Sequence, residues 1–357
     1  MENLEDIKSV YRSKRVFLTG HTGFKGSWLL LLLKELGANV FGYSLNPQTS
    51  ESLYVQIKGE TLCDSHIGDI REAEELSKAV LKCNPDFIFH LAAQPLVIES
   101  YNKPLETFNT NIIGTANLLE AVRKIEGPCN VVCITTDKVY DNKEWDYPYR
   151  EIDRLGGFDP YSSSKAAAEL LISSYRNSFF NIENYEIHKK AIASARAGNV
   201  IGGGDWAENR LVPDIVRSLQ SSKPIKLRNP NSVRPWQHVL EPLYGYLLLG
   251  AKLGEKPHLF SSSWNFGPFL EDVLTVEEIA KIALENVSDG VIENAKDASE
   301  RHEAHKLKLD INKSLTELGW RPKWNANKAV EKTMNWYFKK GDLKAYTIQQ
   351  IKEYLHK

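Results

Sequence analysis

The sequence predicts an α/β protein in which an N-terminal, Rossmann-type doubly wound parallel sheet precedes a smaller mixed α/β substrate domain. Three observations predict this architecture. Short apolar stretches alternate with helix-forming stretches from residue 15 onward, a glycine-rich turn follows the first of them, and a polar run at 135–140 follows the apolar stretch 131–134. Open α/β sheets bind ligands at the carboxyl ends of their strands, so we expect the functional site there.

Length and composition allow a large core and exclude several classes of function. The chain has 357 residues, 42% hydrophobic and 25% charged, which is enough for one large or two modest domains. A net charge of -1 without a basic arm argues against a nucleic-acid partner. The longest apolar run, 28–33, is too short to span a bilayer, and the charged residues 1–8 do not resemble a signal peptide. We therefore expect a cytoplasmic enzyme with no membrane partner.

The cysteines and histidines do not predict a metal site. The four cysteines fall in or beside apolar segments rather than in metal-type pairs. His302 and His305 lie three residues apart without further Cys or His nearby, which is poor support for zinc. We expect no metal, and we expect reduced packing cysteines at Cys63, Cys83, Cys129 and Cys133.

The first strand-helix-strand unit carries the signal for a dinucleotide cofactor. Its predicted elements are a strand at 15–19, a helix at 27–36 and a strand at 39–43, with the turn Gly20-His-Thr-Gly23-Phe-Lys-Gly26 after the first strand. Glycines there let backbone amides and the helix N-terminus approach a pyrophosphate, which a Cβ would obstruct. The place of the glycines between strand and helix favours a dinucleotide site over an ordinary turn.

The next segments leave the choice between NAD and NADP open. The second strand is followed by Tyr43-Ser44-Leu45-Asn46, without the Asp or Glu that would bind the ribose hydroxyls. Asp69 fits either a contact with the adenine or the N-cap of a helix that starts at Arg71. A buried strand at 86–90 then runs into small residues, which suit the close passage of a cofactor.

Two predicted helices carry polar residues with special roles. The helix at 104–125 contains Asn111 on an apolar surface, where its amide needs a buried hydrogen-bond partner. Tyr161 and Lys165 are four residues apart in the next long helix and share one face. A cation near a phenol favours the phenolate, so we expect the pKa of Tyr161 to fall from its usual value near ~10 toward neutrality.

Together these motifs resemble the extended short-chain dehydrogenase/reductase family, over nearly the whole chain. The resemblance rests on the glycine turn, Asp69, the strand end His90-Leu-Ala-Ala93, Asn111, Thr136 and the Tyr161/Lys165 pair. Within that family the Thr-Asp pair and four later segments resemble nucleotide-sugar 4,6-dehydratases, in particular the branch that acts on CDP-glucose. These segments are Arg196-Ala-Gly-Asn199-Val-Ile-Gly, Asp205-Trp206, Arg210-Leu-Val-Pro213 and Asp310-x-x-Lys313-x-x-x-x-Leu318-Gly319-Trp320.

Lys138 distinguishes this chain from most of those dehydratases, which have Glu after the Thr-Asp pair. The CDP-glucose branch resembles this sequence in having Lys there. Lys138 could remove the C5 proton if its pKa were lowered, or it could stabilise the enolate while another group moves the proton. A solvated loop cation is the third interpretation, so the identity of the C5 base stays open.

The resemblance implies NAD-dependent oxidation at C4, loss of water across C5 and C6, and reduction at C6. Tyr161 would take the C4 hydroxyl proton and Asp137 would protonate the leaving oxygen. The implied catalytic residues are Thr136, Asp137, Lys138, Tyr161 and Lys165. The implied cofactor contacts are Gly20, Thr22, Gly23, Phe24, Lys25, Gly26, Asp69, Ile70, Leu91, Ala92, Ala93, Asn111, Tyr161 and Lys165. The implied substrate contacts are Gln94, Thr136, Asn199, Arg210, Lys226, Arg234 and His302.

We divide the chain into an NAD-binding domain at 1–198 and a cap at 199–357 that mainly binds the sugar nucleotide and can exchange segments with the first. The regular α/β rhythm breaks at 199, where a glycine cluster, a helix headed by Pro213 and a basic stretch follow. Arginines and lysines there could pair with a diphosphate. Amphipathic helices at 329–339 and 345–355 are expected to close the cap, with Trp336 and Tyr337 packing inside.

Three functional classes remain: a dehydratase, a related nucleotide-sugar epimerase or reductase, and a catalytically silent, cofactor-sensing binding protein. An epimerase of this family needs only Thr or Ser, Tyr and Lys, so the Asp137-Lys138 pair favours the dehydratase. Silent members usually lose Tyr161 or Lys165, and this chain retains both. The resemblance also implies at least a homodimer, in which the helices 104–125 and 161–177 form a four-helix bundle with the same pair in another subunit.

Overall fold

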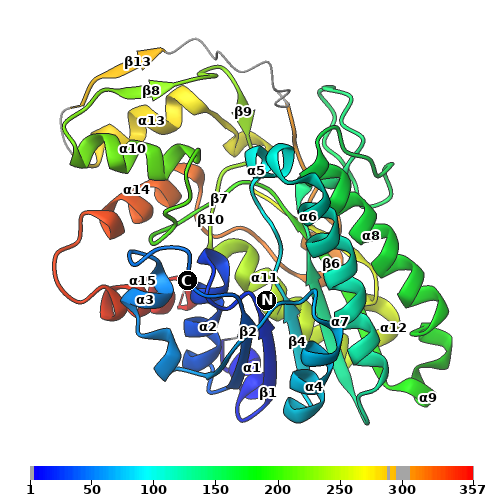
Figure 1. Cartoon of the computed structure of the whole chain (residues 1–357). Helices are drawn as coiled ribbons and strands as arrows, with labels where there is room; N and C mark the ends of the chain where they lie inside the picture. The colour runs from blue at the N-terminus through cyan, green and yellow to red at the C-terminus, as the bar shows by residue number, and fades with distance from the viewer. Residues whose placement is uncertain (1–3, 288–289, 295–305, 357) are drawn as a thin grey trace.

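A computed structural model describes residues 4–287, 290–294 and 306–356, and its centre is a seven-stranded sheet (Figure 1). All neighbouring strands are parallel, in the order β11-β6-β5-β4-β1-β2-β3. Strands β1 to β3 are added toward one edge of the sheet and β4, β5, β6 and β11 toward the other, so the strand order reverses between β1 and β4. The predicted doubly wound parallel sheet is confirmed. Its strands are β1 (Arg15–Thr19), β2 (Asn39–Ser44), β3 (Asp64–Ile67), β4 (Phe87–His90), β5 (Cys129–Ile134), β6 (Lys190–Ala197) and β11 (Ser263–Phe266).

Helices cover both faces of the sheet and form two separate hydrophobic cores. Side chains alternate along β5, so that Val131 and Cys133 enter one core whereas Val132 and Ile134 enter the other. Both faces are therefore buried, which explains why the strands are apolar throughout. The first core contains residues of α4 (Ala73–Cys83), α7 (Gly114–Arg123) and α8 (Pro160–Ser178), and the second those of α1 (Leu4–Tyr11), α2 (Phe24–Glu35) and α11 (Leu240–Glu255).

Helix α2 begins at Phe24, three residues before the predicted start, and so includes the third glycine of the turn. Gly23 is its N-cap with extended backbone angles. A Cβ on Gly26 would lie 2.0 Å from the carbonyl oxygen of Gly20. The third glycine therefore allows the helix to start directly against the turn.

The predicted helix at 104–125 is divided by a wide turn. It consists of α6 (Pro104–Phe108), the π-helical turn η2 (Asn109–Ile113) and α7. A π turn rotates the following residues and often occurs at functional positions. It contains Asn111, whose carbonyl accepts a hydrogen bond from Thr115 Oγ1 at 2.7 Å.

The second half of the chain returns to the first. Strand β11 pairs with β6 at the edge of the sheet, and α11 packs beneath β5 and β6. Most of the remaining elements form the cap, toward the upper left of Figure 1, whereas the short helix α12 (Pro257–Phe260) lies at the lower right, against α11. The cap elements include α10 (Leu211–Gln220), α13 (Val276–Glu285), α14 (Ala326–Tyr337) and the strand pairs β7 (Val200–Ile201) with β10 (Gln237–His238), β8 (Ile225–Leu227) with β13 (Ile292–Asn294), and β9 (Val233–Arg234) with β12 (Leu274–Thr275).

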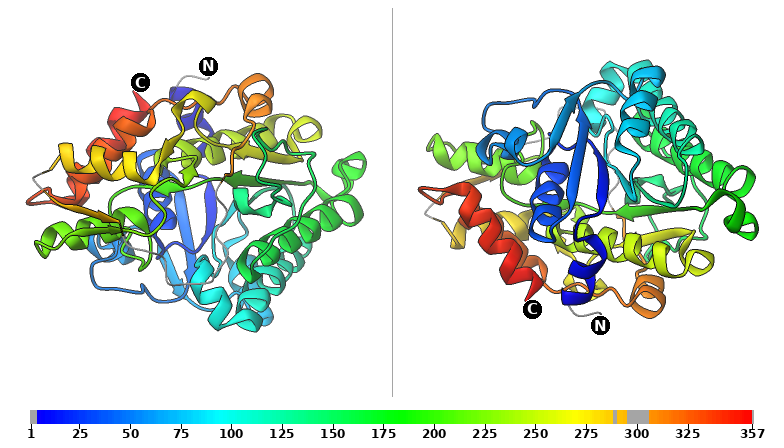
Figure 2. Two further views of the ribbon diagram at one scale, coloured as in Figure 1. Left: turned by 90° about the horizontal axis from the view of Figure 1, so that it is seen from above. Right: turned by 90° about the horizontal axis from the view of Figure 1, so that it is seen from below.

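The C-terminal helix α15 (Leu343–Leu355) joins the two halves rather than closing the cap alone. It packs against both α14 and α2, and Figure 2 shows it beside the N-terminal elements. Trp336 is 1% exposed and donates from Nε1 to Thr347 Oγ1 at 2.9 Å, so the packing role predicted for it is confirmed. Glu241 of α11 accepts a hydrogen bond from Tyr354 at 2.8 Å and adds a polar link to the same helix.

The shorter elements complete the described chain. Its four cysteines are free, and they pack in or beside the two cores as predicted.

Among the described helices, none has the length and apolar character needed to cross a bilayer. The short elements are α3 (Leu53–Gln56), η1 (Gly59–Thr61), α5 (Val97–Asn102), η3 (Asp137–Val139), η4 (Ile182–Asn184), α9 (Tyr185–His188), α12 (Pro257–Phe260), η5 (Leu270–Asp272) and η6 (Ser314–Leu318).

Candidate active site

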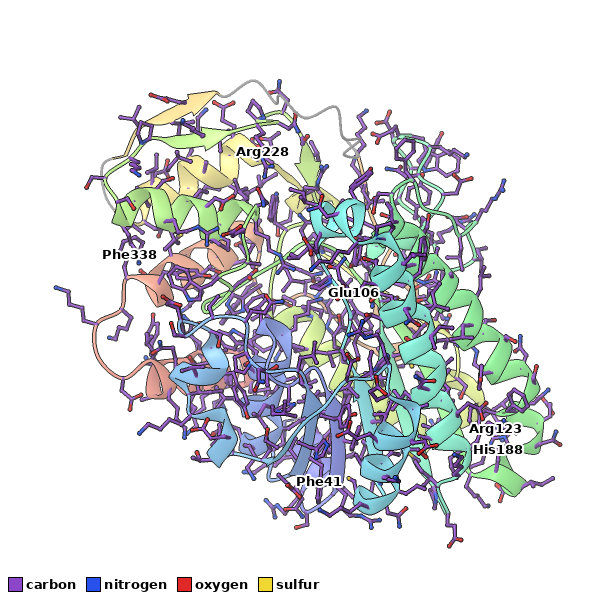
Figure 3. All side chains as sticks on the ribbon, viewed as in Figure 1. Phe41, Glu106, Arg123, His188, Arg228 and Phe338 are labelled. Atoms are coloured by element: carbon purple, nitrogen blue, oxygen red, sulfur yellow. The ribbon has the colours of Figure 1, made fainter. Side chains whose placement is uncertain are left out.

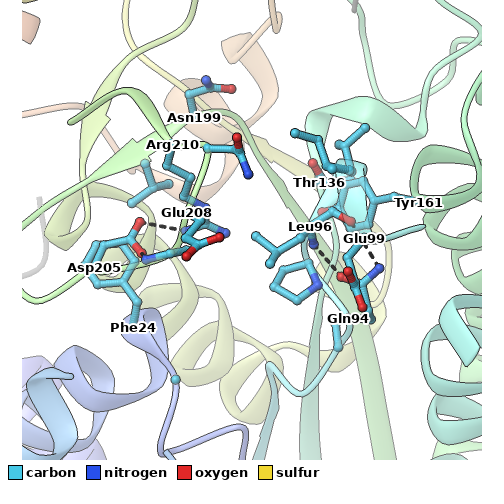
Figure 4. A pocket seen from close by; sticks show the side chains of 18 of the residues that line it. Phe24, Gln94, Leu96, Glu99, Thr136, Tyr161, Asn199, Asp205, Glu208 and Arg210 are labelled. Carbon is cyan, nitrogen blue, oxygen red and sulfur yellow. Dashed lines mark hydrogen bonds and ion pairs between the residues drawn. The ribbon is translucent and has the colours of Figure 1, made fainter. Parts of the chain in front are cut away.

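A cleft of about 1870 Å³ runs between the carboxyl ends of the strands and the cap. Arg228, just after β8, and Glu106, on α6, line opposite parts of it (Figure 3). Figure 4 shows Asn199, Asp205 and Arg210 on one side, facing Thr136 and Tyr161 across the gap. The cleft exceeds the ~300–1,000 Å³ of a typical small-molecule pocket, so it has room for two ligands at once.

The glycine turn forms one end of the cleft. Gly20 has φ +74, and a Cβ on it would lie 2.8 Å from the amide nitrogen of Ala92, so glycine is required there. No side chain caps the N-terminus of α2, whose first N–H groups remain available to an anion. Of the predicted cofactor contacts, the cleft lining includes Gly20, Thr22, Gly23, Phe24, Lys25, Gly26, Asp69, Ile70, Leu91, Ala92, Ala93, Tyr161 and Lys165.

Asp69 does not cap the helix that follows it, which was one of its two expected roles. Its carboxylate accepts hydrogen bonds from the backbone N–H of Arg71 at 2.9 Å and from Arg71 Nε at 2.9 Å. Helix α4 begins only at Ala73, with Glu72 as its N-cap, so the N-cap interpretation of Asp69 is wrong. Asp69 instead holds the turn after β3 while lining the cleft.

Asn111 and Gln94 support the cleft from behind. Asn111 is 1% exposed and is not among the residues that line the cleft. Its amide bonds the backbone of Gln94 and Ser164 Oγ at 2.8 Å, which supplies the predicted buried partner. Gln94 lines the cleft, but its side chain bonds the backbone of Leu96 and the hydroxyl of Thr107.

Thr136 and Asp137 stand at the carboxyl end of β5, as predicted. The Thr136 hydroxyl donates to Asp137 Oδ1 at 3.0 Å, while Asp137 Oδ2 is buried and has no protein partner among the described residues. Burial raises the pKa of Asp137, although Lys138, the Thr136 hydroxyl, Arg234 and Lys25 all act to lower it. The structure therefore holds a carboxyl group that keeps its proton more readily than an exposed aspartate.

Tyr161 and Lys165 both line the cleft from the first turns of α8, which Asp159 caps by accepting from the backbone N–H of Ser162 at 2.9 Å. Burial raises the pKa of Tyr161 to about 12 and outweighs the lowering effects of the Thr136 hydroxyl and of Arg210. The pKa of Tyr161 therefore does not fall toward neutrality as the sequence led us to expect. The Lys165 ammonium donates to the carbonyl of Ile134 at 3.2 Å. Burial also lowers the pKa of Lys165 to about 8.

Two features near the glycine turn were not predicted from the sequence: the lowered pKa of Lys25 and the buried Tyr246 beside it. Burial, Arg210 and Lys165 lower the pKa of Lys25 to about 7, against the opposing charge of Asp137. The Lys25 ammonium lies 5.9 Å from the ring centre of Tyr246, whose buried hydroxyl has no partner within the described part of the chain. The place of Lys25 within a glycine turn that faces a ligand could have indicated its lowered pKa. No pattern in the sequence of α11 indicated that Tyr246 lies beside it.

The predicted substrate contacts come mainly from the cap side. Asn199, Lys226 and Arg234 line the cleft, and Arg210 does so while bonded to Asp205 at 2.7 Å. His302 lies outside the described residues. Within the described ranges, no group of His, Cys, Asp and Glu is arranged to hold a metal ion.

Known proteins resemble this chain along most of its length. One curated relative is a CDP-glucose 4,6-dehydratase from Salmonella typhimurium, 49% identical over 330 residues that cover 92% of each chain. A human dTDP-D-glucose 4,6-dehydratase is 25% identical and covers 91% of this chain and 90% of its own. Among solved structures, a dTDP-glucose 4,6-dehydratase from Streptomyces venezuelae with NAD bound has a TM-score of 0.77 and 24% identity, and it covers 90% of this chain and 96% of its own.

A family profile described as GDP-mannose 4,6 dehydratase matches residues 17–333. The match begins in β1 and ends in α14, so it includes the glycine turn, the end of β5, the start of α8 and most of the cap. Both ligand-facing sides of the cleft thus come from the matched region, and the chain belongs to the GDP-mannose 4,6 dehydratase family.

Proposed function

We propose that this chain catalyses the 4,6-dehydration of CDP-glucose, giving CDP-4-dehydro-6-deoxy-D-glucose and water, with NAD regenerated in each turnover. The Salmonella typhimurium relative, similar over almost the full length of both chains, supports this substrate. The NAD bound in the Streptomyces venezuelae structure supports this cofactor. Lys138 after the Thr-Asp pair supports the same branch of the family.

The observation that carries the reaction type is the state of Asp137. Burial raises its pKa, and its Oδ2 atom has no protein partner among the described residues although Asp137 lines the cleft. Such a carboxyl group can hold a proton and deliver it to a leaving hydroxyl. An epimerase changes only the configuration at C4 and needs no second acid. Asp137 therefore favours dehydration over epimerisation.

The glycine turn and the uncapped start of α2 fit the diphosphate of a dinucleotide, because backbone N–H groups and the helix dipole both favour an anion there. Held there, NAD would supply a hydride acceptor for the oxidation at C4 and a hydride donor for the reduction at C6. Small residues after β4 leave space for its rings, since Leu91, Ala92 and Ala93 line the same end of the cleft.

Tyr161 is the base for the C4 hydroxyl. Thr136 hydrogen-bonds the phenol and lowers its pKa, while Lys165 and the charge of the oxidised cofactor would supply the remaining stabilisation of the phenolate. Once C4 is a ketone, the C5 proton becomes acidic. Asp137 then protonates the departing C6 oxygen, and the half-buried Lys138 acts at C5, as the base or as the cation that stabilises the enolate.

The cap binds the sugar nucleotide in this proposal. Arg234 is 4% exposed, lines the cleft and approaches Asp137 closely enough to lower its pKa, which suits a cation near the diphosphate and sugar. The cofactor domain comprises 1–198 with the returning β11 and α11, and the rest of 199–357 forms the cap. Further contacts are proposed for Gln94, Asn199, Arg210, Lys226 and His302.

We also propose a homodimer that uses the α6–α7 and α8 surfaces. Leu105 is 83% exposed and Leu170 is 61% exposed, which leaves apolar side chains on both helices for a partner subunit to cover. At the far end of this surface, shown in Figure 3, Arg123 stacks 4.0 Å from the ring centre of Phe179.

The substrate is tested by incubating purified protein and NAD with CDP-, dTDP-, GDP- and UDP-hexoses. We expect a 4-keto product from CDP-glucose at a rate well above that from the others.

The Tyr161→Phe variant keeps the ring and its packing, so it should fold and yet turn over at least ~10²-fold more slowly. Faster conversion of another nucleotide sugar would contradict the substrate, and near-normal turnover by the variant would contradict the role of Tyr161.

Asp137→Asn is expected to separate oxidation from elimination. The amide cannot donate the proton that the C6 oxygen needs, whereas C4 oxidation remains possible. In a single turnover, reduced cofactor should therefore accumulate and raise the absorbance of the reduced nicotinamide band. Parent-like dehydration without that accumulation would exclude Asp137 as the acid.

Lys138 variants distinguish a C5 base from a spectator cation. Lys138→Met should suppress exchange of the C5 hydrogen with solvent deuterium if the amine removes the C5 proton. Lys138→Glu restores the carboxylate of the commoner dehydratases and should retain more exchange than Met. If both variants convert CDP-glucose at the parent rate, Lys138 has no catalytic role.

Light scattering tests the dimer. We expect a mass of about twice 40.5 kDa at micromolar concentration, because the exposed leucines of both helices become buried on association. The double variant Leu105→Glu with Leu170→Glu should shift the mass toward a single chain. A parent protein that stays at 40.5 kDa would refute the assembly.

A further inference from the structure

Glu169 lies on the same face of α8 as the residues of the proposed acid/base pair. Tyr161, Lys165 and Glu169 are spaced by four residues, so their side chains form one stripe along the helix. The first two line the cleft, whereas Glu169 lies outside its lining and its side chain is 1% exposed. It is therefore one turn too deep to touch a substrate.

The Glu169 carboxylate connects three elements. Its Oε1 atom accepts a hydrogen bond from Thr135 Oγ1 at 2.5 Å, at the end of β5. Its Oε2 atom accepts from Arg196 Nη2 at 2.8 Å and from Ser194 Oγ at 2.8 Å, both on β6. Thr135 immediately precedes Thr136, so the carboxylate sets the position of α8 relative to the loop that carries the other groups of the site.

We propose that Glu169 is a positioning residue of the reaction, which holds α8 against the carboxyl ends of β5 and β6 and keeps Lys165 in its cationic, working position beneath Tyr161. This inference rests on the proposed function, because it assigns a role within that reaction. Glu169 acts through Lys165 and Thr135 rather than on the substrate.

The carboxylate is ionised although it is buried. Burial acts to raise the pKa of Glu169, but Arg196 and the hydroxyls of Thr135 and Ser194 lower it by more, and the net shift is downward. A buried ion pair is kept only when its hydrogen bonds are satisfied, and removal of one partner is costly. Glu169 therefore contributes a fixed negative charge one helical turn from Lys165.

The negative charge of Glu169 acts on Lys165 together with several other titratable groups that face this amine. His90 on β4 and Lys25 on α2 each have a pKa that Lys165 lowers, so both face it, and Cys133 on β5 faces it with a neutral thiol whose pKa burial raises to about 12. Arg176 and Arg196 face Glu169 from α8 and β6. Burial lowers the pKa of Lys165 to about 8, while Cys133 and then Glu169 raise it, so the carboxylate is one of two groups that help the amine to remain protonated near neutral pH.

The test compares a variant without the charge to one without a hydrogen bond. Glu169→Gln keeps the shape and an acceptor for Thr135 but removes the charge, so the alkaline limb of kcat should move about one pH unit toward acid, with kcat at pH 8 reduced on the order of 10-fold. Thr135→Val removes the bond to Glu169 but leaves the charge, so kcat should fall several-fold with the limb in its parent position. The KM for CDP-glucose should stay within about twofold in both, since neither change reaches the proposed substrate contacts.

Thr135→Ser is the matched control, because it retains the hydroxyl and should restore the parent kcat. A lower kcat in Glu169→Gln with an unshifted alkaline limb would reduce Glu169 to a purely structural role and overturn the proposal. Circular dichroism and thermal unfolding show whether Glu169→Gln folds. If it does not, Thr135→Val and Thr135→Ser are compared instead, and an equal kcat for these two variants overturns the proposal. The profiles are measured on whichever nucleotide hexose the parent converts, so an error in the proposed substrate is seen in the parent alone.

Discussion

The ion pair between Glu169 and Arg196 holds together the part of the sheet on which the site is built. Two opposite charges are almost completely removed from water there, with side chains 1% and 3% exposed. Desolvation on that scale costs several kcal/mol per ion unless further hydrogen bonds compensate. Thr135, Ser194, Ser263 and Tyr140 supply those bonds, so the pair ties β5, β6 and β11 to α8 in a single geometry.

Charge crowding around Asp137 is the second constraint. Lys25, Lys138 and Arg234 all bias this carboxyl toward its ionised form, and burial biases it toward the neutral form. Burial has the larger effect in this structure, whereas the same burial partly discharges Lys25, with its pKa of about 7. The cleft therefore combines an acid, Asp137, that keeps its proton with one amine, Lys25, that gives its proton up near neutral pH.

The sequence predicted most of what depends on local pattern. Strands β1, β2, β4 and β5 and the glycine turn follow from apolar runs and from glycine sterics, and the Tyr161–Lys165 spacing places both side chains on one helix face, which lines the cleft. Contacts between distant segments were not predictable in this way. Nothing near Glu169 in the chain indicates a partner on β6, and no local pattern shows that β11 completes the sheet. The raised pKa of Tyr161 likewise depends on burial by elements far away in the sequence.

The position of β11 has a consequence for how the protein is made. The strand is the last of the seven in sequence, and it pairs with β6 only after residue 266 has been synthesised. Until then β6 presents an open edge of unpaired backbone groups. Folding during translation therefore cannot finish one half before the other begins. Until β11 is in place, the unpaired edge of β6 is a site at which a partly made chain can pair with another strand instead.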